Sequence, residues 1–163
     1  MSGVVIYLKV DLYIAQWLRH EYGGLPIEFP KNSLENDILE LGLTKRPMFA
    51  SVVGPGEKRV PIAVPNFRSK NVKYNTYLPK KSRDILQACI RKRFVLAFWQ
   101  DMQKFGNIGK QKQDLVWAWM EAHGIDMTDT NFHTLIKIYQ RRRNVYRKQN
   151  WRNLKTKSQN DKK

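Results

Sequence analysis

Three consecutive arginines, Arg141 to Arg143, have the clearest chemical character in this sequence. Lys137 precedes them, Arg147 and Lys148 follow, and no acidic residue occurs from 130 to 150. A guanidinium group presents a planar fork of hydrogen-bond donors that matches a phosphate. The run therefore predicts binding to a polyanion, although a solvated basic helix face would have the same composition.

The polar side chains beside this run are of types that can read bases. The groups able to hydrogen-bond to base edges in the major groove of DNA belong to Asn131, His133, Thr134 and Lys137. The arginines further along suit phosphates, and Arg141 could also meet a guanine. The last arginine of the run lies nearer the apolar side of the segment, so it could instead pair inside the fold.

Two other basic clusters lie outside this segment. One is "IRKRF", around residue 92, and the other is "GKQK", around residue 111. Contacts of this kind hold phosphates and position a protein without reading sequence, and an exposed solubilising surface is the alternative. The predicted nucleic-acid site comprises Asn131, Thr134, Lys137, Arg141, Arg142, Arg143, Arg147, Lys148, Arg91, Lys92, Arg93, Lys110 and Lys112.

Signals for catalysis are weak. The stretch "FGNIGKQ" lacks the first glycine of a phosphate-binding loop and has Gln111 where a metal-binding Ser or Thr belongs. The histidines have no metal-ligand spacing with one another or with Cys89, which falls on an apolar helix stripe. We therefore expect no enzyme activity, no metal and no cofactor.

The charge of the chain is unevenly distributed. Its 163 residues carry a formal net charge of +16. Residues 1–65 hold seven basic and seven acidic residues, whereas residues 66–163 hold 23 basic and seven acidic ones. Nucleic acid is the partner that such a field indicates first, although an anionic membrane or an acidic protein would feel it too. A single cysteine, no signal sequence and no apolar run of membrane-spanning length predict a cytoplasmic protein without a membrane partner.

The neutral part, residues 1–65, predicts a small α+β region. A strand is expected over 4–10, followed by a helix over 12–23 that Asp11 caps. Residues 48–64 are typical of a hairpin or two edge strands around a "GPGEK" turn. We expect this neutral region to mediate self-association into a homodimer.

A second helix is expected in the same region, over 34–42, with Ser33 as its cap. Leu34, Ile38 and Leu41 recur at helical spacing. These three residues therefore share one face of the expected helix, which Gly42 ends.

Residues 66–81 are basic and polar, lie between two prolines, and are predicted to be a linker. Aromatic and basic side chains alternate in it, and this pattern is also typical of single-strand binding, where aromatic rings stack on bases. The residues concerned are Phe67, Tyr74 and Tyr77 with Arg68, Lys70 and Lys73. Aromatic anchors that hold the linker on its own domain are the alternative.

Beyond the linker the pattern is helical. Helices are expected over 82–105, 112–122 and 129–147, and residues 82–150 form the expected nucleic-acid-binding region. A disordered basic tail is predicted over 151–163. The apolar positions expected to face inward include Leu86, Cys89, Ile90, Phe94, Phe98, Met102, Phe105, Leu115, Ala118, Trp119, Phe132, Leu135, Ile136, Tyr139 and Tyr146.

The last two helices resemble the helix-turn-helix family over residues 112–147. Gly124 ends the first helix and Ile125 can fill the core at the turn. The sequence departs from the family at Met120, where a small residue is usual, and in a turn about two residues longer than the tight form. The resemblance implies that the second helix enters the major groove and that the protein binds as a dimer. An ordinary α-hairpin is the alternative.

A second resemblance concerns "VWAWMEAHGI" followed by "IYQRRRNVY". These runs are similar to small basic proteins of phages and mobile elements of gut Bacteroidales. The resemblance implies a bacterial or phage context and no particular mechanism.

The sequence therefore predicts an α+β fold with a small mixed N-terminal region and a mainly helical, helix-turn-helix-like C-terminal bundle. The expected function is non-catalytic binding of double-stranded DNA, as a transcriptional regulator or accessory factor of a phage or mobile element. Two alternatives remain open. One is an RNA or single-stranded nucleic-acid binder, and the other is a structural component of a virion or nucleoprotein particle.

Overall fold

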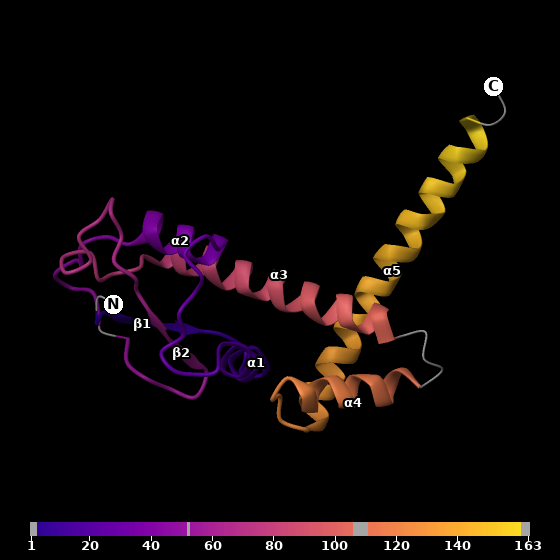
Figure 1. The fold of residues 1–163 in the computed structure, drawn as a ribbon, viewed down its shortest axis with the longest axis horizontal. Helices are drawn as coiled ribbons and strands as arrows, with labels where there is room; N and C mark the ends of the chain where they lie inside the picture. The colour runs from indigo at the N-terminus through magenta and orange to yellow at the C-terminus, as the bar shows by residue number, and fades with distance from the viewer. Residues whose placement is uncertain (1–2, 52, 106–110, 161–163) are drawn as a thin grey trace.

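A computed structural model describes residues 3–51, 53–105 and 111–160 of the chain. Figure 1 shows the elements in chain order, which are β1 (Val5–Lys9), α1 (Leu12–Tyr22), α2 (Leu34–Gly42), β2 (Arg59–Ala63), α3 (Lys80–Phe105), α4 (Lys112–Ala122) and α5 (Asp129–Asn160). The predicted α+β class is confirmed, because a small two-stranded sheet lies in the N-terminal part and the C-terminal part is mostly helical.

The sheet pairs distant segments of the N-terminal part. β1 and β2 are antiparallel, with Tyr7 opposite Pro61. Ile27 bridges the other edge of β2, because its N–H donates to the Pro61 carbonyl at 2.8 Å and its carbonyl accepts from Ala63 N–H at 2.9 Å. The predicted hairpin does not form, since residues 48–51 contain no strand. Pairing with β1 instead lets β2 bury alternate side chains in the core.

The face of α2 that carries the apolar period is largely exposed. Leu34 and Leu41 are 63% and 82% exposed and Ile38 is half-buried, whereas Glu35, Asn36 and Leu39 are buried. The Glu35 carboxylate pairs with a guanidinium of α3, and Asn36 Nδ2 donates to the Lys31 carbonyl, whereas the buried Asn36 Oδ1 has no hydrogen-bond partner among the described residues. An ion pair offsets the desolvation of a buried carboxylate, so the contact between Glu35 and α3 outweighs the apolar period of α2.

The segment predicted to be a linker, residues 66–81, is packed onto the N-terminal part. Val72 and Leu78 are buried in the core. Thr44 and Tyr77 pair through their backbones, with N···O distances of 2.8 and 3.1 Å. α3 also begins before the expected linker ends. The chain therefore passes from one part to the other within a single packed structure.

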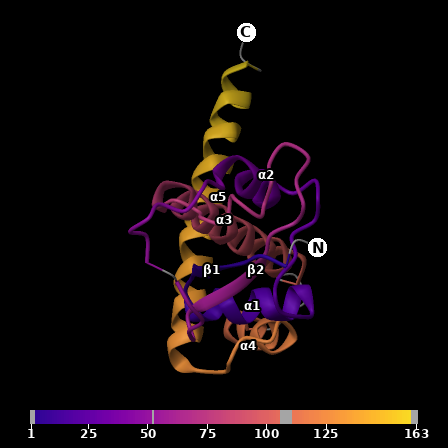
Figure 2. The same cartoon turned by 90° about the vertical axis from the view of Figure 1, so that its left-hand side faces the viewer.

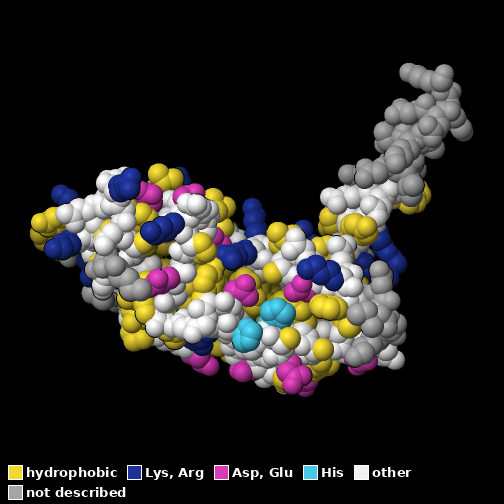
Figure 3. Space-filling model, in the orientation of Figure 1, with side chains coloured by type: hydrophobic (Ala, Val, Ile, Leu, Met, Phe, Trp, Pro, Cys, Tyr) yellow, Lys and Arg dark blue, Asp and Glu magenta, His cyan; other side chains and the backbone are white. Residues whose placement is uncertain are grey.

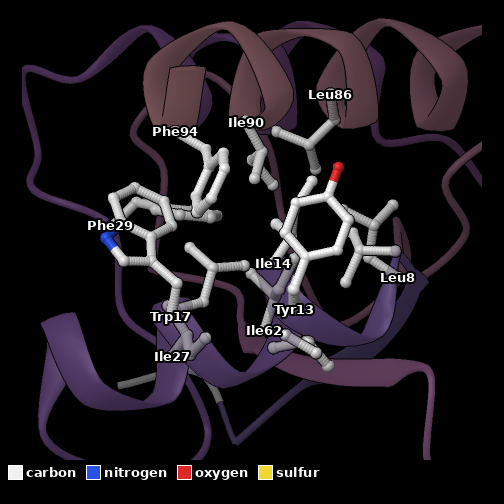
Figure 4. Close-up of a cluster of buried hydrophobic side chains, with 14 of the residues drawn as sticks. Leu8, Tyr13, Ile14, Trp17, Ile27, Phe29, Ile62, Leu86, Ile90 and Phe94 are labelled. Atoms are coloured by element: carbon white, nitrogen blue, oxygen red, sulfur yellow. The ribbon is translucent and has the colours of Figure 1, made fainter. Parts of the chain in front are cut away.

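α3 is the central helix of the core. Figures 1 and 2 show α1 and the sheet on one side of α3 and α2 on the other. Phe94 contacts Tyr13 and Trp17 of α1, with ring centroids 5.2 and 5.3 Å apart, and Trp119 of α4, at 5.7 Å. Figure 4 shows its ring pointing from α3 into the cluster above α1. The predicted inward stripe of α3 is largely confirmed, since its buried residues are Leu86, Ile90, Phe94, Phe98 and Met102, but the prediction is wrong for Phe105, which is 48% exposed at the end of the helix.

The turn between α4 and α5 is as predicted. Gly124 has φ of +65°, a conformation that side chains disfavour, and Ile125 is buried beneath the turn. α4 itself is rotated from the prediction, because it buries Val116 and Met120 while Ala118 is exposed. The large Met120 thus fills core space where a tight helix-turn-helix has a small residue.

α5 is longer than predicted. It continues to Asn160, so residues 151–160 are helical where the sequence predicts a disordered tail. No glycine or proline follows Gly124, and the Lys, Arg and Gln of this segment are good helix formers. Figure 1 shows the second half of α5 projecting away from the body. Among the described helices, none combines the length and apolar character that crossing a bilayer requires.

Candidate nucleic-acid interface

Five of the predicted site residues line one groove between α3 and α5. The groove has a volume of about 460 Å³. We call it the α3–α5 groove. Its lining residues are Tyr13, Arg91, Val95, Thr134, Lys137, Ile138, Arg141, Arg142 and Val145.

The helical period of α5 places these side chains together. Ile138, Arg141 and Val145 recur at three- and four-residue spacing and therefore share one face. That face adjoins the one on which Leu135 is buried, so α5 packs on the core and still lines the groove. Val95 contributes to the floor from α3. The result is an apolar floor with charged side chains around it.

Four cations converge on the groove, and none of the described residues that line it is acidic. Arg91 comes from α3, and Lys137, Arg141 and Arg142 come from α5. All four are exposed. Figure 3 shows basic side chains over α3 and beside α5, and acidic ones along the lower edge, over α2 and in the middle of the same face. Such a concentration of one charge attracts a polyanion, and arginine forks suit phosphate oxygens.

Arg91 occupies a special position in this set. Its guanidinium is ion-paired with Asp11, whose carboxylate also accepts a hydrogen bond from Tyr13 Oη at 3.4 Å. The hydrogen bond to Asp11 raises the pKa of Arg91 further above its already high value, so the side chain stays charged. Arg91 also lines a neighbouring hollow of about 480 Å³, to which Lys9 and Lys58 contribute. Because both partners are about half exposed, the pair itself adds little stability and can exchange for another anion.

Arg93 is used by the fold and not by the groove. Its Nη1 lies 3.3 Å from Oε1 of the buried Glu35, and its guanidinium packs 5.5 Å from the ring centroid of Tyr22. A buried carboxylate needs a counter-ion, and this position on α3 supplies it. The prediction that Arg93 contacts phosphate is corrected accordingly.

The remaining cations of the two outlying clusters differ in their surroundings. Lys92 is exposed on α3, and Lys112 is exposed with its Nζ 5.9 Å from the ring centroid of Tyr139. Neither lines the α3–α5 groove. Lys110 lies outside the described residues.

Asn131 does not face solvent as predicted. It is only 6% exposed, its Nδ2 donates to the Asp126 carbonyl at 3.0 Å, and its N–H donates to Thr128 Oγ1 at 3.3 Å. These bonds cap the start of α5 and hold the turn, so Asn131 cannot read a base. The hydroxyl of Thr134 is also occupied, since it donates to the Thr130 carbonyl at 2.8 Å. Among the described residues at the start of α5, Asn131 and Thr134 thus use their polar groups within the helix and its cap, and fewer side chains than predicted can read bases.

The other predicted cations of α5 lie further along the helix. Arg143 is half-buried beside the apolar stripe, whereas Arg147 and Lys148 are exposed. Trp99 of α3 contacts this stretch, with its ring centroid 6.1 Å from that of Tyr146. Arg147 and Lys148 belong to the second half of α5, which projects from the body (Figure 1).

A second polar cluster was not singled out from the sequence. His123 stacks on Trp119 with ring centroids 4.1 Å apart, and its Nε2 lies 3.7 Å from Oδ2 of Asp101, which also accepts from Trp119 Nε1 at 3.1 Å. His20 lies beside it, at a ring-centroid distance of 6.3 Å. Across the described residues, no group of three or more His, Cys, Asp or Glu is arranged to hold a metal ion. No spacing in the sequence connects these residues, since three different helices and a turn bring them together.

Some aromatic residues of the segment 66–81 hold it against the rest of the fold, and others are exposed to solvent. Phe67 packs against the core, and Tyr77 is held by its backbone bridge. Lys70 is also engaged, since its Nζ donates to the carbonyls of Leu41 and Leu43 at the end of α2. Of the three aromatic residues considered for base stacking, Tyr74 alone is largely exposed.

Neither a protein-family model, nor a curated protein, nor a solved structure matches this chain. What the protein does must therefore be inferred from the chemistry of its own surface.

Proposed function

We propose that this protein binds double-stranded DNA, mainly through the phosphate backbone, without catalysing a reaction. The observation that carries the proposal is the α3–α5 groove. Arg91 of α3 stands beside Lys137, Arg141 and Arg142 of α5 there, in a concave surface without an acidic lining residue among those described. Charge-assisted contacts to phosphate hold and orient a duplex but do not read its sequence.

The length and direction of α5 favour a duplex over a small anion. Its 32 residues span about 48 Å at the helical rise, which exceeds what one phosphate group needs. The sequence of α5 contains nine Lys or Arg against one Asp. A projecting cationic helix can lie in the major groove or along the backbone of B-form DNA. Because Asn131 is buried, contacts are expected from Lys137 onward and not from the helix start.

Salt dependence provides the first test. Six exposed cations contribute, namely Arg91, Lys137, Arg141, Arg142, Arg147 and Lys148. About six phosphate contacts predict a slope near −5 for log K against log salt concentration on duplex DNA. Fluorescence anisotropy with a labelled duplex, across a salt series, measures this slope.

A pair of matched double variants locates the contacts. Arg141→Ala/Arg142→Ala should weaken duplex binding at least tenfold at about 0.1 M salt and make the slope shallower by about 2. Arg68→Ala/Lys73→Ala removes the same charge from an exposed segment away from the groove and should have a much smaller effect. Equal losses in both double variants would show that only net charge matters, and the assignment of the groove would then be wrong.

Binding of single-stranded nucleic acid is the second candidate function, and one observation favours it. A basic hollow of about 520 Å³ is lined by Arg68, Lys70 and Lys73 among others, close in sequence to the exposed ring of Tyr74. Stacking on one exposed aromatic ring beside cations is typical of single-strand binding. Tyr74→Ala would then weaken binding to single strands more than Arg141→Ala/Arg142→Ala does.

Regulation or an accessory role in a phage or mobile element, in the cytoplasm, is compatible with such binding. Weak sequence preference would favour an accessory or packaging role over a regulator. Competition between a random duplex and candidate promoter fragments at physiological salt distinguishes the two.

A further inference from the structure

The outer face of α2 is apolar although it meets solvent. Leu34, Ile38 and Leu41 stand one turn apart along the helix; the two leucines are 63% and 82% exposed, and Ile38 is half-buried and packs against the core at the edge of this face. The inner face of the same helix carries Leu39 together with the buried Glu35 and Asn36. We call Leu34, Ile38 and Leu41 the α2 stripe. A helix that buries polar residues and exposes its apolar period is unusual in a monomer and is typical of a contact surface.

The direction of the stripe is fixed by contacts at both ends of α2. At its start, the predicted cap is confirmed, because Ser33 Oγ accepts from Asn36 N–H at 3.2 Å. At its end, Lys70 Nζ donates to the Leu41 and Leu43 carbonyls at 2.9 and 2.7 Å. A cation at a helix C-terminus also interacts favourably with the helix dipole.

The inner face of α2 is equally constrained. Glu35 pairs with Arg93 of α3, as described above. At Gly42, a Cβ atom would lie only 2.8 Å from the Cβ of Ser82, so α2 and α3 approach more closely there than a side chain permits. Rotating the stripe inward would break the buried ion pair and force the helices apart. The stripe therefore stays on the surface of the single chain.

We propose that the α2 stripe is the contact surface between two copies of this chain, which pack antiparallel about a two-fold axis. The spacing of the stripe is self-complementary, since Leu34 and Leu41 lie four and three residues on either side of Ile38. An axis near Ile38 places Leu34 of one copy against Leu41 of the other, and the reverse. This is the arrangement that an isologous interface requires.

If two copies meet, the charge distribution favours the α2 stripe over the basic parts of the chain. The chain carries a net charge of +16, all of it from residues 66–163, so two copies repel one another wherever their basic parts meet. α2 belongs to the neutral part and lies far from the projecting half of α5. At physiological ionic strength charges are screened beyond about 8 Å, so contact at α2 keeps the basic surfaces from interacting strongly.

Other exposed apolar side chains are less suited to pairing of copies. Val145 and Tyr146 are exposed on α5, directly among its arginines. Two copies meeting there would bring like charges into contact. The basic helix thus stays available for an anionic partner.

The size of the stripe limits the strength of the dimer. Nine residues of α2 extend only about 13 Å, whereas a stable interface buries roughly 800 Å² on each partner. Met48 and Phe49, which follow α2 in the chain, are also exposed, at 92% and 96%. Because a small interface is typical of weak association, we expect a reversible dimer with a dissociation constant in the micromolar range.

Asp37 provides a second test of the proposal, because its substitution should strengthen the dimer instead of weakening it. It is exposed and adjoins Ile38 in the chain, so a two-fold axis near Ile38 brings the Asp37 carboxylates of both copies close together. Like charges across an interface weaken it. Asp37→Asn should therefore tighten the dimer severalfold, which a purely structural role of the stripe would not produce.

Sedimentation equilibrium of the full chain, freed of nucleic acid, tests the proposal at about 1–200 µM, a range that spans the expected dissociation constant. Leu34→Gln/Leu41→Gln should weaken the dimer at least tenfold. Leu96→Gln, a change of the same kind at a leucine of α3 that is 51% exposed, should leave it unchanged. Circular dichroism and thermal unfolding check that each variant keeps its fold.

The outcomes are distinct from those of DNA binding, because no DNA is present. A reversible dimer that the α2 double variant weakens, that Asp37→Asn tightens and that Leu96→Gln leaves intact supports the proposal. A monomer over the whole range, an open-ended polymer, or a dimer insensitive to the α2 stripe would overturn it.

Discussion

Arg91 of α3 and Asp11, eighty residues earlier in the chain, form an ion pair beside two hollows, both of which Arg91 lines. The carboxylate of Asp11 also accepts the hydroxyl of Tyr13, so it is held in place beside the groove. An anion that binds Arg91 must therefore compete with Asp11. The ion pair lowers the positive electrostatic potential of the α3–α5 groove, because Asp11 neutralises one of the four cations that line the groove.

Removing this competition should strengthen DNA binding. Asp11→Asn leaves a side chain of the same size, frees Arg91 and adds one unit of positive charge beside the groove. We expect a two- to fivefold gain in duplex affinity at low salt, in line with the modest energy of about 1 kcal/mol or less of an exposed ion pair. Anisotropy with the same labelled duplex measures the gain.

The control for Asp11→Asn is Glu121→Gln, which adds the same charge at an exposed position on α4. Its effect should be smaller and should vanish first as salt is raised, because distant charges are screened. An equal gain from both variants would mean that Asp11 acts only through net charge.

The pairing of Arg93 with Glu35 predicts an effect on stability and none on binding. Arg93→Ala leaves a buried carboxylate without its counter-ion and should lower the free energy of unfolding by about 3 kcal/mol. Urea unfolding measures this loss. In the double variant with Glu35→Gln, most of the loss should be recovered. Duplex affinity should stay within about twofold of wild type, and a large loss would return Arg93 to the binding surface.

What could be predicted from the sequence depended on whether a feature is local. The period of α3 predicted the burial of Phe94, and Gly124 predicted the turn before α5, because both follow from spacing and backbone preference. The same reasoning could not tell which face of α2 is buried, because apolar spacing groups Leu41 with its neighbours without placing them relative to the core. There the decisive contact comes from Arg93, more than fifty residues away.

The candidate site shows the same division. The run from Arg141 was recognisable by composition, and α5 does carry it exposed. That Arg91 would stand beside it could not be predicted, because only the packing of α3 against α5 brings them to one groove. Asn131 was assigned by its type alone, although its amide is consumed by the carbonyl of Asp126.

Gly124 should be intolerant of a side chain. Its φ is +65°, and a Cβ there would lie 2.9 Å from Cδ2 and 3.0 Å from Cβ of His20. Gly124→Ala should therefore lower the free energy of unfolding by about 1–3 kcal/mol, from backbone strain and crowding together. Gly24→Ala is the matched control, because a Cβ at Gly24 meets nothing within 4 Å. Chemical denaturation of both variants compares them, and equal stability would mean that the turn adapts without cost.

Tyr13 should make the fold sensitive to alkaline pH. Burial raises the pKa of its hydroxyl above the usual value of about 10, and the charge of Asp11 raises this pKa further, while Arg91 opposes the shift. The folded state thus favours the neutral phenol. The stability that the neutral Tyr13 hydroxyl contributes is complete below pH 10 and is lost as the pH rises through the pKa of the folded state.

Urea unfolding from about pH 9 to 11 should show Tyr13→Phe losing stability less steeply than wild type. Tyr74→Phe, at an exposed position, should follow the wild-type curve, and a Tyr13→Phe curve parallel to wild type would contradict this role for Tyr13.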